Sequence, residues 1–252
     1  MEVPYHVSPP HREALLGEGL SSLEACLAYE RGEMVKAAVV GRETLRFSPH
    51  GHGCYYMKRI QGRGFRDIIN EARVLERLHP AGIPVPEPVA FALGNRSGVL
   101  ITVALPARRT LEHVLLEEEP DADRADRLVS RLAQLVRGLH DQGVNHRDLY
   151  VGHVMVDDAD NLFLLDLGRA ETRMRVPLRR VVKDLAALHF STPERSADTD
   201  LRSAFLRHYF GPETTGPALE RLARAVDRKA QRMRSHASRK IARGAPNIHI
   251  NE

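Results

Sequence analysis

The segment NHRDLYVGHVMV, residues 145–156, and the shorter segment DLG, residues 166–168, decide the fold that we expect for this chain. Between the H-R-D tripeptide and the DLG segment, two short apolar strands flank a turn rich in Asp and Asn, residues 157–161, which is typical of a β-hairpin. A hairpin returns the chain to the edge from which it started, so we expect Asp148 and Asp166 at the same edge of a cleft. The sequence therefore predicts a site with two carboxylates.

Together the two segments resemble the paired kinase motifs H-R-D-x-x-x-x-N and D-F-G. In phosphoryl transfer one carboxylate orients the incoming hydroxyl and accepts its proton, and another binds the Mg²⁺ that neutralises the phosphate charge. We assign the first role to Asp148 and the second to Asp166. Either motif alone can arise by chance on a surface loop or at a strand end, but their order and the hairpin between them favour a kinase.

The N-terminal part of the chain supplies candidates for holding ATP. Lys58 lies in the middle of a predicted strand, residues 54–60, where a charged side chain needs a partner. Glu71 lies on the predicted helix that follows, residues 67–79, and a pair with Lys58 would place the lysine on the α- and β-phosphates. The alternative is a solvated lysine and a solvated glutamate, the commoner case for either residue alone.

Glycines give a weaker indication of the nucleotide site. The pattern G-x-G-x-x-G does not occur before Lys58, and the short run 62–64 with two glycines comes after it. Only the turn at Gly41 and Arg42, between two strands predicted within residues 33–47, can cover the nucleotide. The phosphates must therefore be held more by Lys58 and the metal than by a glycine-rich loop.

The character of the chain changes near Pro106. Strands dominate residues 1–105, in which a proline-spaced connector, 83–91, precedes a near-continuous apolar strand, 98–105. Helices dominate residues 106–252. We expect an α+β, two-lobed, protein-kinase-like fold, with a small β-rich N-lobe and a larger helical C-lobe that carries the catalytic loop and the metal-binding DLG. The elements expected in the C-lobe are helices over 111–119 and 125–142 and hairpin strands over 154–156 and 162–165.

Composition excludes several other classes of protein. The 252 residues are 42% hydrophobic, which is enough for a real core and excludes a wholly disordered chain. Cys26 and Cys54 are too few for a disulfide framework and fit a reducing cytosol. No apolar run approaches the roughly 20 residues of a membrane-spanning helix, and the first residues lack the pattern of a signal peptide. We expect a soluble cytoplasmic protein that is at most attached to a membrane surface.

Positive charge is concentrated near the C-terminus. The net charge is +4, yet residues 221–243 carry nine Lys and Arg against one Asp, a local excess of +8. A basic helix with interleaved apolar residues fits peripheral contact with an anionic membrane, and a solvated surface of the C-lobe is the alternative. Nucleic-acid binding is not expected, because no aromatic stacking platform or nucleic-acid motif accompanies the charge.

Three segments together resemble one family of kinases. NHRDLYVGHVMV is joined by RRVVKDLAALHFS, residues 179–191, and GRETLRF, residues 41–47. They look like the lipopolysaccharide kinases of the heptose/Kdo (WaaP-like) family, bacterial enzymes that phosphorylate inner-core sugars on a protein-kinase-like fold. The resemblance covers about residues 33–191. It implies ATP and Mg²⁺ as cofactors, a lipopolysaccharide core glycolipid as acceptor, and peripheral contact with the cytoplasmic face of the inner membrane.

This resemblance bears on two further residues. His153 stands where protein kinases have a metal-binding asparagine, and the family also tends to have histidine there. It either ligates Mg²⁺, although imidazole is a poor ligand for hard cations, or it forms a hydrogen bond with the catalytic loop. Asp184 resembles the buried helix aspartate that braces the H-R-D backbone. Basic residues after the DLG would face an anionic acceptor or only solubilise the surface: Arg169, Arg173, Arg175, Arg179 and Arg180.

Two other functions stay open on the sequence. A RIO-like or aminoglycoside-type kinase would keep the same four residues but would not require the later arginines or the pattern H-R-D-x-Y-x-x-H. A non-catalytic pseudokinase scaffold is favoured only by the missing glycine loop, and intact Lys58, Asp148 and Asp166 oppose it. We therefore expect an ATP-dependent kinase that phosphorylates a heptose or Kdo hydroxyl of the lipopolysaccharide inner core.

Overall fold

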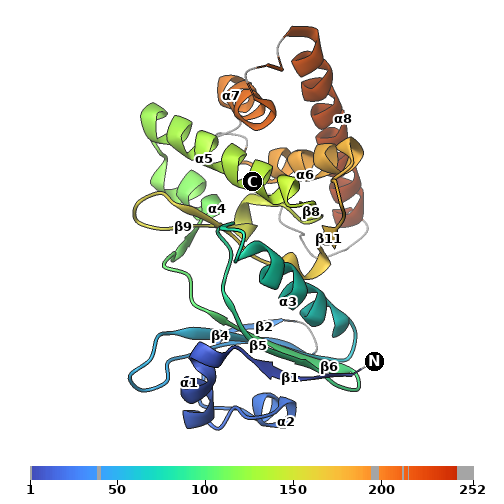
Figure 1. The fold of residues 1–252 in the computed structure, drawn as a ribbon. Coiled ribbons are helices and arrows are strands. Elements are labelled where there is room, and N and C mark those ends of the chain that lie inside the picture. Colours follow the sequence, from blue (N-terminus) through green and yellow to red (C-terminus); the bar gives the residue numbers. More distant parts are fainter. Residues whose placement is uncertain (1, 39–40, 194–198, 212, 215, 243–252) are drawn as a thin grey trace. The chain divides into compact units, whose positions relative to one another are not determined.

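A computed structural model describes residues 2–38, 41–193, 199–211, 213–214 and 216–242 (Figure 1). The chain forms two compact units. The first unit consists of Met1–Pro106 and Asp166–Arg169, and the second of Ala107–Leu165 and Ala170–Glu252. Residues 166–169, which include the DLG turn that we expected in the C-lobe, are grouped with the first unit.

A six-stranded antiparallel sheet forms the framework of the first unit, in the order β1-β5-β6-β4-β3-β2 (Figure 1). In its middle, β3, β4 and β6 pair without a break, with Lys58 of β4 between Thr44 and Leu100. A slip of one residue would turn Lys58 to the other face of the sheet, so this pairing fixes the direction of its side chain. The strands are β1 (Val3–Val7), β2 (Glu33–Ala38), β3 (Arg42–Phe47), β4 (Tyr55–Gln61), β5 (Pro88–Leu93) and β6 (Ser97–Val103).

Strand β5 corrects the prediction of a connector over residues 83–91. The spaced prolines favoured a connector there, yet Val89–Leu93 is buried and β5 pairs with both β1 and β6. Pro88 is the first residue of the strand, a position where the missing backbone N–H is tolerated. The strand β1 and two short helices, α1 (Arg12–Gly17) and α2 (Leu23–Leu27), were also not predicted.

Helix α3 (Arg66–Leu78) lies within one residue of its predicted bounds. Ile68, Ala72 and Leu75 are almost completely buried, as their helical spacing requires. The helix also packs on the DLG turn, η4 (Leu167–Arg169), where the side-chain amide of Asn70 donates to the carbonyl of Gly168 at 2.9 Å. This bond, together with the contact between Lys58 and Asp166, joins the turn to the first unit.

Helices make up most of the second unit (Figure 1). The predicted helix over 111–119 is a short α-turn that continues as a π-helix, and the predicted hairpin is present, with Leu162 opposite Val156. The helical elements are α4 (Leu111–His113), η2 (Val114–Glu118), α5 (Ala122–Asp141), η3 (Val151–His153), α6 (Leu178–Ser191), α7 (Thr199–Phe210) and α8 (Gly216–Ile241). The short strands are β7 (Arg109–Thr110), β8 (Val144–Asn145), β9 (Val154–Val156), β10 (Leu162–Leu164) and β11 (Glu171–Thr172).

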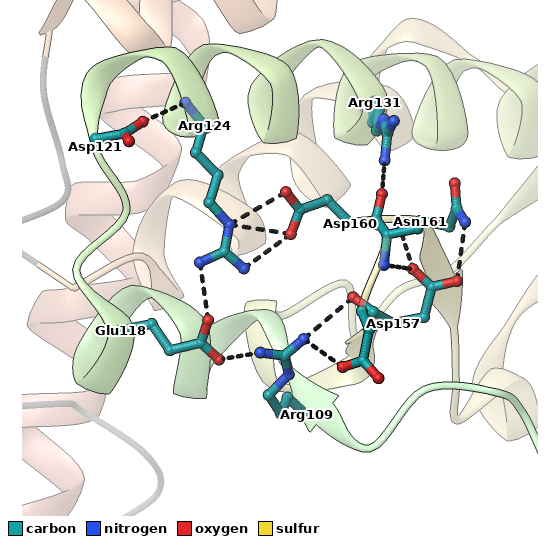
Figure 2. A network of polar contacts seen from close by, with 10 residues as sticks. Arg109, Glu118, Asp121, Arg124, Arg131, Asp157, Asp160 and Asn161 are labelled. Atoms are coloured by element: carbon teal, nitrogen blue, oxygen red, sulfur yellow. Dashed lines mark hydrogen bonds and ion pairs between the residues drawn. The ribbon is translucent and has the colours of Figure 1, made fainter.

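A network of ion pairs ties the turn of the β9–β10 hairpin to the start of α5 (Figure 2). The guanidinium of Arg124 lies 2.8 Å from a carboxylate oxygen of Glu118 and 2.8 Å from one of Asp160. The other oxygen of Glu118 lies 2.7 Å from Arg109. Because these carboxylates are mostly buried, they need the arginines as partners, and the hairpin turn is held in place as a result.

Replacing Arg124 with Met should destabilise the protein by about 2 kcal/mol, because it removes the charged hydrogen bonds of two largely buried carboxylates. Arg124 lowers the pKa of Asp160, and burial raises the pKa of Glu118 but hydrogen bonds from Arg124 and Arg109 outweigh it and lower the value. This contribution is present above the ordinary pKa values of 3.8 and 4.5, and it is lost as the pH falls through the lower folded values. Urea unfolding at neutral and acid pH should therefore show a deficit that shrinks in acid.

The matched control for this substitution is Arg224→Met, which breaks an exposed pair between Arg224 and Glu220 on α8. Exposed pairs contribute about 0–1 kcal/mol, so this variant should unfold nearly as the parent does. Equal losses in the two variants, or a deficit for Arg124→Met that does not change with pH, would contradict a structural role for the network.

Candidate active site

Lys58 stands at the centre of the candidate site in the first unit. Its Nζ atom lies 2.8 Å and 2.7 Å from the two carboxylate oxygens of Glu71 and 3.6 Å from Oδ1 of Asp166. The Glu71 side chain is 9% exposed and that of Lys58 is 30% exposed, so the pair is well shielded from water. The structure thus brings Lys58 together with Glu71, as the sequence predicted, and adds Asp166 to the same group.

Electrostatics keep Lys58 charged. Burial opposes the ammonium form, but the carboxylates of Glu71 and Asp166 outweigh burial and raise the pKa of Lys58 above its ordinary value of 10.5. At neutral pH the side chain is therefore an ammonium that Glu71 holds in one direction. Such a fixed cation is suited to binding phosphate oxygens, because charge-assisted hydrogen bonds to anions are the strong ones.

Asp166 combines an exposed carboxylate with an unusual backbone conformation. Its side chain is 57% exposed, in contrast to that of Glu71, and its backbone has a φ of 59°, in the left-handed region. Non-glycine residues take up this conformation mainly where the surroundings impose it, often at functional sites. The carbonyl of Gly168, two residues later, is held by Asn70, a polar residue of α3 that sequence reasoning missed.

The turn at Gly41 and Arg42 also lies in the first unit. Gly41 has a φ of 80°, and a side chain there would bring a carbon within 2.3 Å of the Gln61 carbonyl oxygen, so only glycine fits against the end of β4. The guanidinium of Arg42 lies 3.2 Å from Asp67, at the start of α3. A contact of this turn with nucleotide stays a prediction.

In the second unit, Asp184 of α6 organises the segment NHRD. Its carboxylate is completely buried and accepts the backbone N–H of His146 at 2.7 Å and that of Arg147 at 2.9 Å. The ring of His140 lies 3.2 Å from the same carboxylate. A buried carboxylate without such donors would be very costly, so these bonds and the shape of the loop depend on each other. The predicted brace at Asp184 is confirmed.

His153 also helps to hold the catalytic loop in place. Its Nδ1 atom lies 2.8 Å from the carbonyl oxygen of Asp148, and because a carbonyl can only accept, Nδ1 carries the proton. The expected hydrogen bond between His153 and the catalytic loop is therefore confirmed. In the neutral ring this tautomer makes Nε2 the acceptor nitrogen, and metal contact by His153 stays a prediction.

Two hydrogen bonds join the catalytic loop to Leu165, the residue directly before the DLG turn. The backbone N–H of Leu165 donates to the His153 carbonyl at 2.9 Å, and the ring of His146 lies 2.9 Å from the Leu165 carbonyl. Asp148 and its supporting residues thus form one preorganised group within the second unit. Lys58, Glu71 and Asp166 form another within the first unit.

The donor set fits magnesium bound together with a nucleotide. No cluster of three His, Cys, Asp or Glu side chains that could hold a metal occurs in the part of the chain that the structure describes. Mg²⁺ does not need such a cluster, because it usually binds through one or two carboxylates plus substrate phosphates and water. Asp166, a carboxylate beside the Lys58 ammonium, would meet that requirement.

The arginines that follow the DLG turn do not form one group. Arg173 and Arg180 both contact Glu171, at 3.0 Å and 3.3 Å. Arg175 and Arg179 are exposed and form no ion pair within the described ranges. Glu171 was missed by sequence reasoning, since a single glutamate in the run RAETRMR carries no signal of its own.

Comparison with known proteins gives a consistent picture. The model of the Lipopolysaccharide kinase (Kdo/WaaP) family matches residues 41–209. Lipopolysaccharide core heptose(I) kinase WaaP of Pseudomonas aeruginosa is 32% identical over 199 residues, 68% of this chain and 74% of the relative. The protein of the same name from Escherichia coli K12 is 28% identical over 230 residues, 79% of this chain and 86% of the relative. The 3-deoxy-D-manno-octulosonic acid kinase of Vibrio cholerae is 31% identical over 104 residues, 39% and 42% of the two chains.

A solved structure shares the fold. The crystal structure of aminoglycoside-3'-phosphotransferase of type VIII has a TM-score of 0.55 at 20% identity and covers 81% of this chain and 98% of its own. At this identity the likeness shows the fold alone, and the expected protein-kinase-like fold class is confirmed. The family match spans more than half of the chain, so the prediction of a kinase with a sugar hydroxyl as acceptor is confirmed as well: the chain belongs to the lipopolysaccharide kinase (Kdo/WaaP) family.

Proposed function

We propose that this chain transfers the γ-phosphoryl group of ATP to a heptose hydroxyl of the lipopolysaccharide inner core, with Mg²⁺ as the metal. The observation that carries the proposal is the ammonium of Lys58 held between Glu71 and Asp166, in a chain of this family. Heptose is favoured over Kdo because the heptose(I) kinases of Pseudomonas aeruginosa and Escherichia coli K12 align with 68% and 79% of the chain, whereas the Vibrio cholerae Kdo kinase aligns with 39%.

The residues of the first unit would hold the nucleotide. Lys58 would bind the α- and β-phosphates, Glu71 would orient it, and Asp166 would hold the magnesium ion. When bound, the metal neutralises the negative charge that accumulates on the phosphates during transfer. The turn at Gly41 and Arg42 would lie over the nucleotide, as the sequence predicted.

Asp148 would act on the acceptor. A carboxylate oxygen of Asp148 orients the sugar hydroxyl and accepts its proton as the new bond to phosphorus forms. His153 and Asp184 keep this loop in one conformation through bonds to its backbone, so no rearrangement is needed when the acceptor binds. His153 is a second candidate contact for the metal.

The acceptor and the base can be tested with two substrates, a core oligosaccharide without phosphate on heptose and one without phosphate on Kdo. The parent protein should phosphorylate the heptose, as located by ³¹P nuclear magnetic resonance of the product. Asp148→Asn should reduce transfer by at least about a hundredfold while nucleotide affinity stays within about twofold, because the base acts on the acceptor and not on ATP. Phosphate on Kdo would contradict the heptose assignment, and near-normal transfer by Asp148→Asn would remove the base role.

The nucleotide site can be tested separately from the acceptor. Asp166→Ala should weaken the binding of Mg-ATP itself, because the metal links the protein to the phosphates. Lys58→Met should lower turnover strongly in a folded protein, since a lysine that only aided solubility could be replaced almost silently. Calorimetry measures the affinity of Asp166→Ala for Mg-ATP, a transfer assay measures the turnover of Lys58→Met, and circular dichroism checks that both variants are folded. Unchanged affinity in Asp166→Ala would contradict its role as metal ligand.

We also propose that α8 contacts the anionic cytoplasmic face of the inner membrane. Val226 and Ala230 are its buried residues, and on the opposite face lies a stripe of exposed arginines at helical spacing. No helix among the described residues combines the length and apolar character needed to cross a bilayer, so any contact would be at the surface. The arginine stripe consists of Arg221, Arg224, Arg228, Arg232 and Arg239. Arg243, the last basic residue of the predicted segment, lies outside the described residues.

The membrane proposal can be tested by reversing charges on two faces of one helix. Arg224→Glu/Arg228→Glu alters the stripe, and Lys229→Glu/Lys240→Glu makes the same change in net charge off the stripe. Each basic residue near an anionic surface contributes about 1 kcal/mol, so the stripe variant should bind phosphatidylserine vesicles at least about thirtyfold more weakly. Phosphorylation of a soluble, deacylated acceptor should not change. Equal loss in both variants, or no vesicle binding by the parent protein, would refute the contact.

A further inference from the structure

Three arginines from different parts of the second unit converge on a single carboxylate, that of Glu171. Arg147 of the catalytic loop lies 3.2 Å from Oε1, and Arg173 and Arg180 lie 3.0 Å and 3.3 Å from Oε2. Within the described residues, no other carboxylate pairs with any of these three arginines. Glu171 is therefore their common counterion, five residues after the metal-binding Asp166.

Backbone pairing brings Glu171 to this place. Strand β11 pairs antiparallel with β8, so that Glu171 lies opposite Asn145, the residue directly before the H-R-D motif. One step further on, the backbone N–H of Arg173 donates to the carbonyl of Gly143 at 2.8 Å. The segment that follows the DLG turn is thus joined to the segment that leads into the catalytic loop.

Arg147 links Glu171 to Asp148, the proposed base. It lies between His146 and Asp148 and has a φ of 73°, a left-handed conformation that is unfavourable for a side chain of this size. Two anchors keep it there: Asp184 accepts its backbone N–H, and Glu171 pairs with its guanidinium. Because Asp148 is the next residue, the direction of its carboxylate depends on this conformation.

Lys183 adds a further positive charge near two of these arginines, Arg147 and Arg180. Burial lowers the pKa of Lys183, and so do the charges of Arg147 and Arg180, although Asp184 and Asp148 act in the opposite direction. The Nε atoms of Arg147 and Arg180 are buried and have no hydrogen-bond partner among the described residues. Without the Glu171 carboxylate these arginines would repel one another, and the Arg147 guanidinium would lose its ion-pair partner.

We propose that Glu171 is a built-in counterion that takes the place of the phosphate with which protein kinases order the same segment. In those enzymes phosphorylation creates new pairs between a phosphate and arginines, which position the catalytic residues. Here the chain supplies the anion as a side chain, so the catalytic loop is ordered without modification. Glu171 is a positioning residue in this account, which acts on Asp148 through Arg147. The inference rests on the proposed kinase activity.

A positioning role for Glu171 can be distinguished from a purely structural one by removing its carboxylate and then supplying another anion. Glu171→Ala and Glu171→Gln should lower kcat at least about tenfold with the KM for ATP changed by less than about threefold, because the nucleotide residues are untouched. Glu171→Asp should recover much of the activity. Formate or acetate should restore Glu171→Ala by occupying the vacated position but should not restore Asp148→Asn. Asp141→Ala, which removes an exposed carboxylate paired with Arg137, is the matched control and should behave as the parent does.

A second measurement does not depend on turnover. Inorganic phosphate should raise the Tm of Glu171→Ala saturably and more than that of the parent, because only the variant offers three arginines without their counterion. A parent protein that fails to phosphorylate any core acceptor would refute the proposed function, whereas normal kcat in Glu171→Ala would refute the role of Glu171 alone. A loss of activity that tracks unfolding, with no rescue by formate or acetate and no stabilisation by phosphate, would reduce Glu171 to a structural residue.

Discussion

The buried carboxylate of Asp184 is the constraint on which the second unit depends. A charge that water cannot reach must be compensated by hydrogen bonds, and here the backbone N–H groups of His146 and Arg147 provide them. The loop cannot relax without leaving this charge unpaired, so Arg147 keeps a left-handed backbone. The position of Asp148 follows directly, and the bond from His153 to its carbonyl closes the arrangement.

The first unit contains a shielded cation, the ammonium of Lys58, which its partners stabilise in a similar way. Lys58 lies in the interior of a sheet, where an ammonium without partners would lose its proton or distort the strand. Glu71 and Asp166 make the charge stable there, and they come from a helix and from a turn that follow much later in the chain. Each unit thus satisfies its own charges before any substrate binds. Groups fixed in this way need little reorganisation during reaction, which is the usual basis of electrostatic catalysis.

The elements that could be predicted are those whose pattern is complete within a few residues. Helix α3 shows a regular apolar spacing, and the β9–β10 hairpin shows two apolar runs around an Asp-rich turn. The sequence predicted a connector where strand β5 lies, because prolines are spaced through residues 83–91, although Pro88 occupies only the strand's first position. The π-helical end of the 111–119 segment has no local signature that we can identify in the sequence.

By itself the sequence determined the chemistry of this protein. The motifs around Asp148 and Asp166, the strand lysine Lys58 and the helix glutamate Glu71 indicated a kinase, because protein kinases carry these groups in that order along the chain. Beyond the predicted pair of Lys58 and Glu71, only the tertiary structure decided which charges meet. Glu171 contacts Arg147 because β11 pairs with β8, and the arginines of α8 form a stripe because the opposite face packs in the protein. Such pairings join residues that are distant in sequence, so their energy depends on burial and distance that no local pattern records.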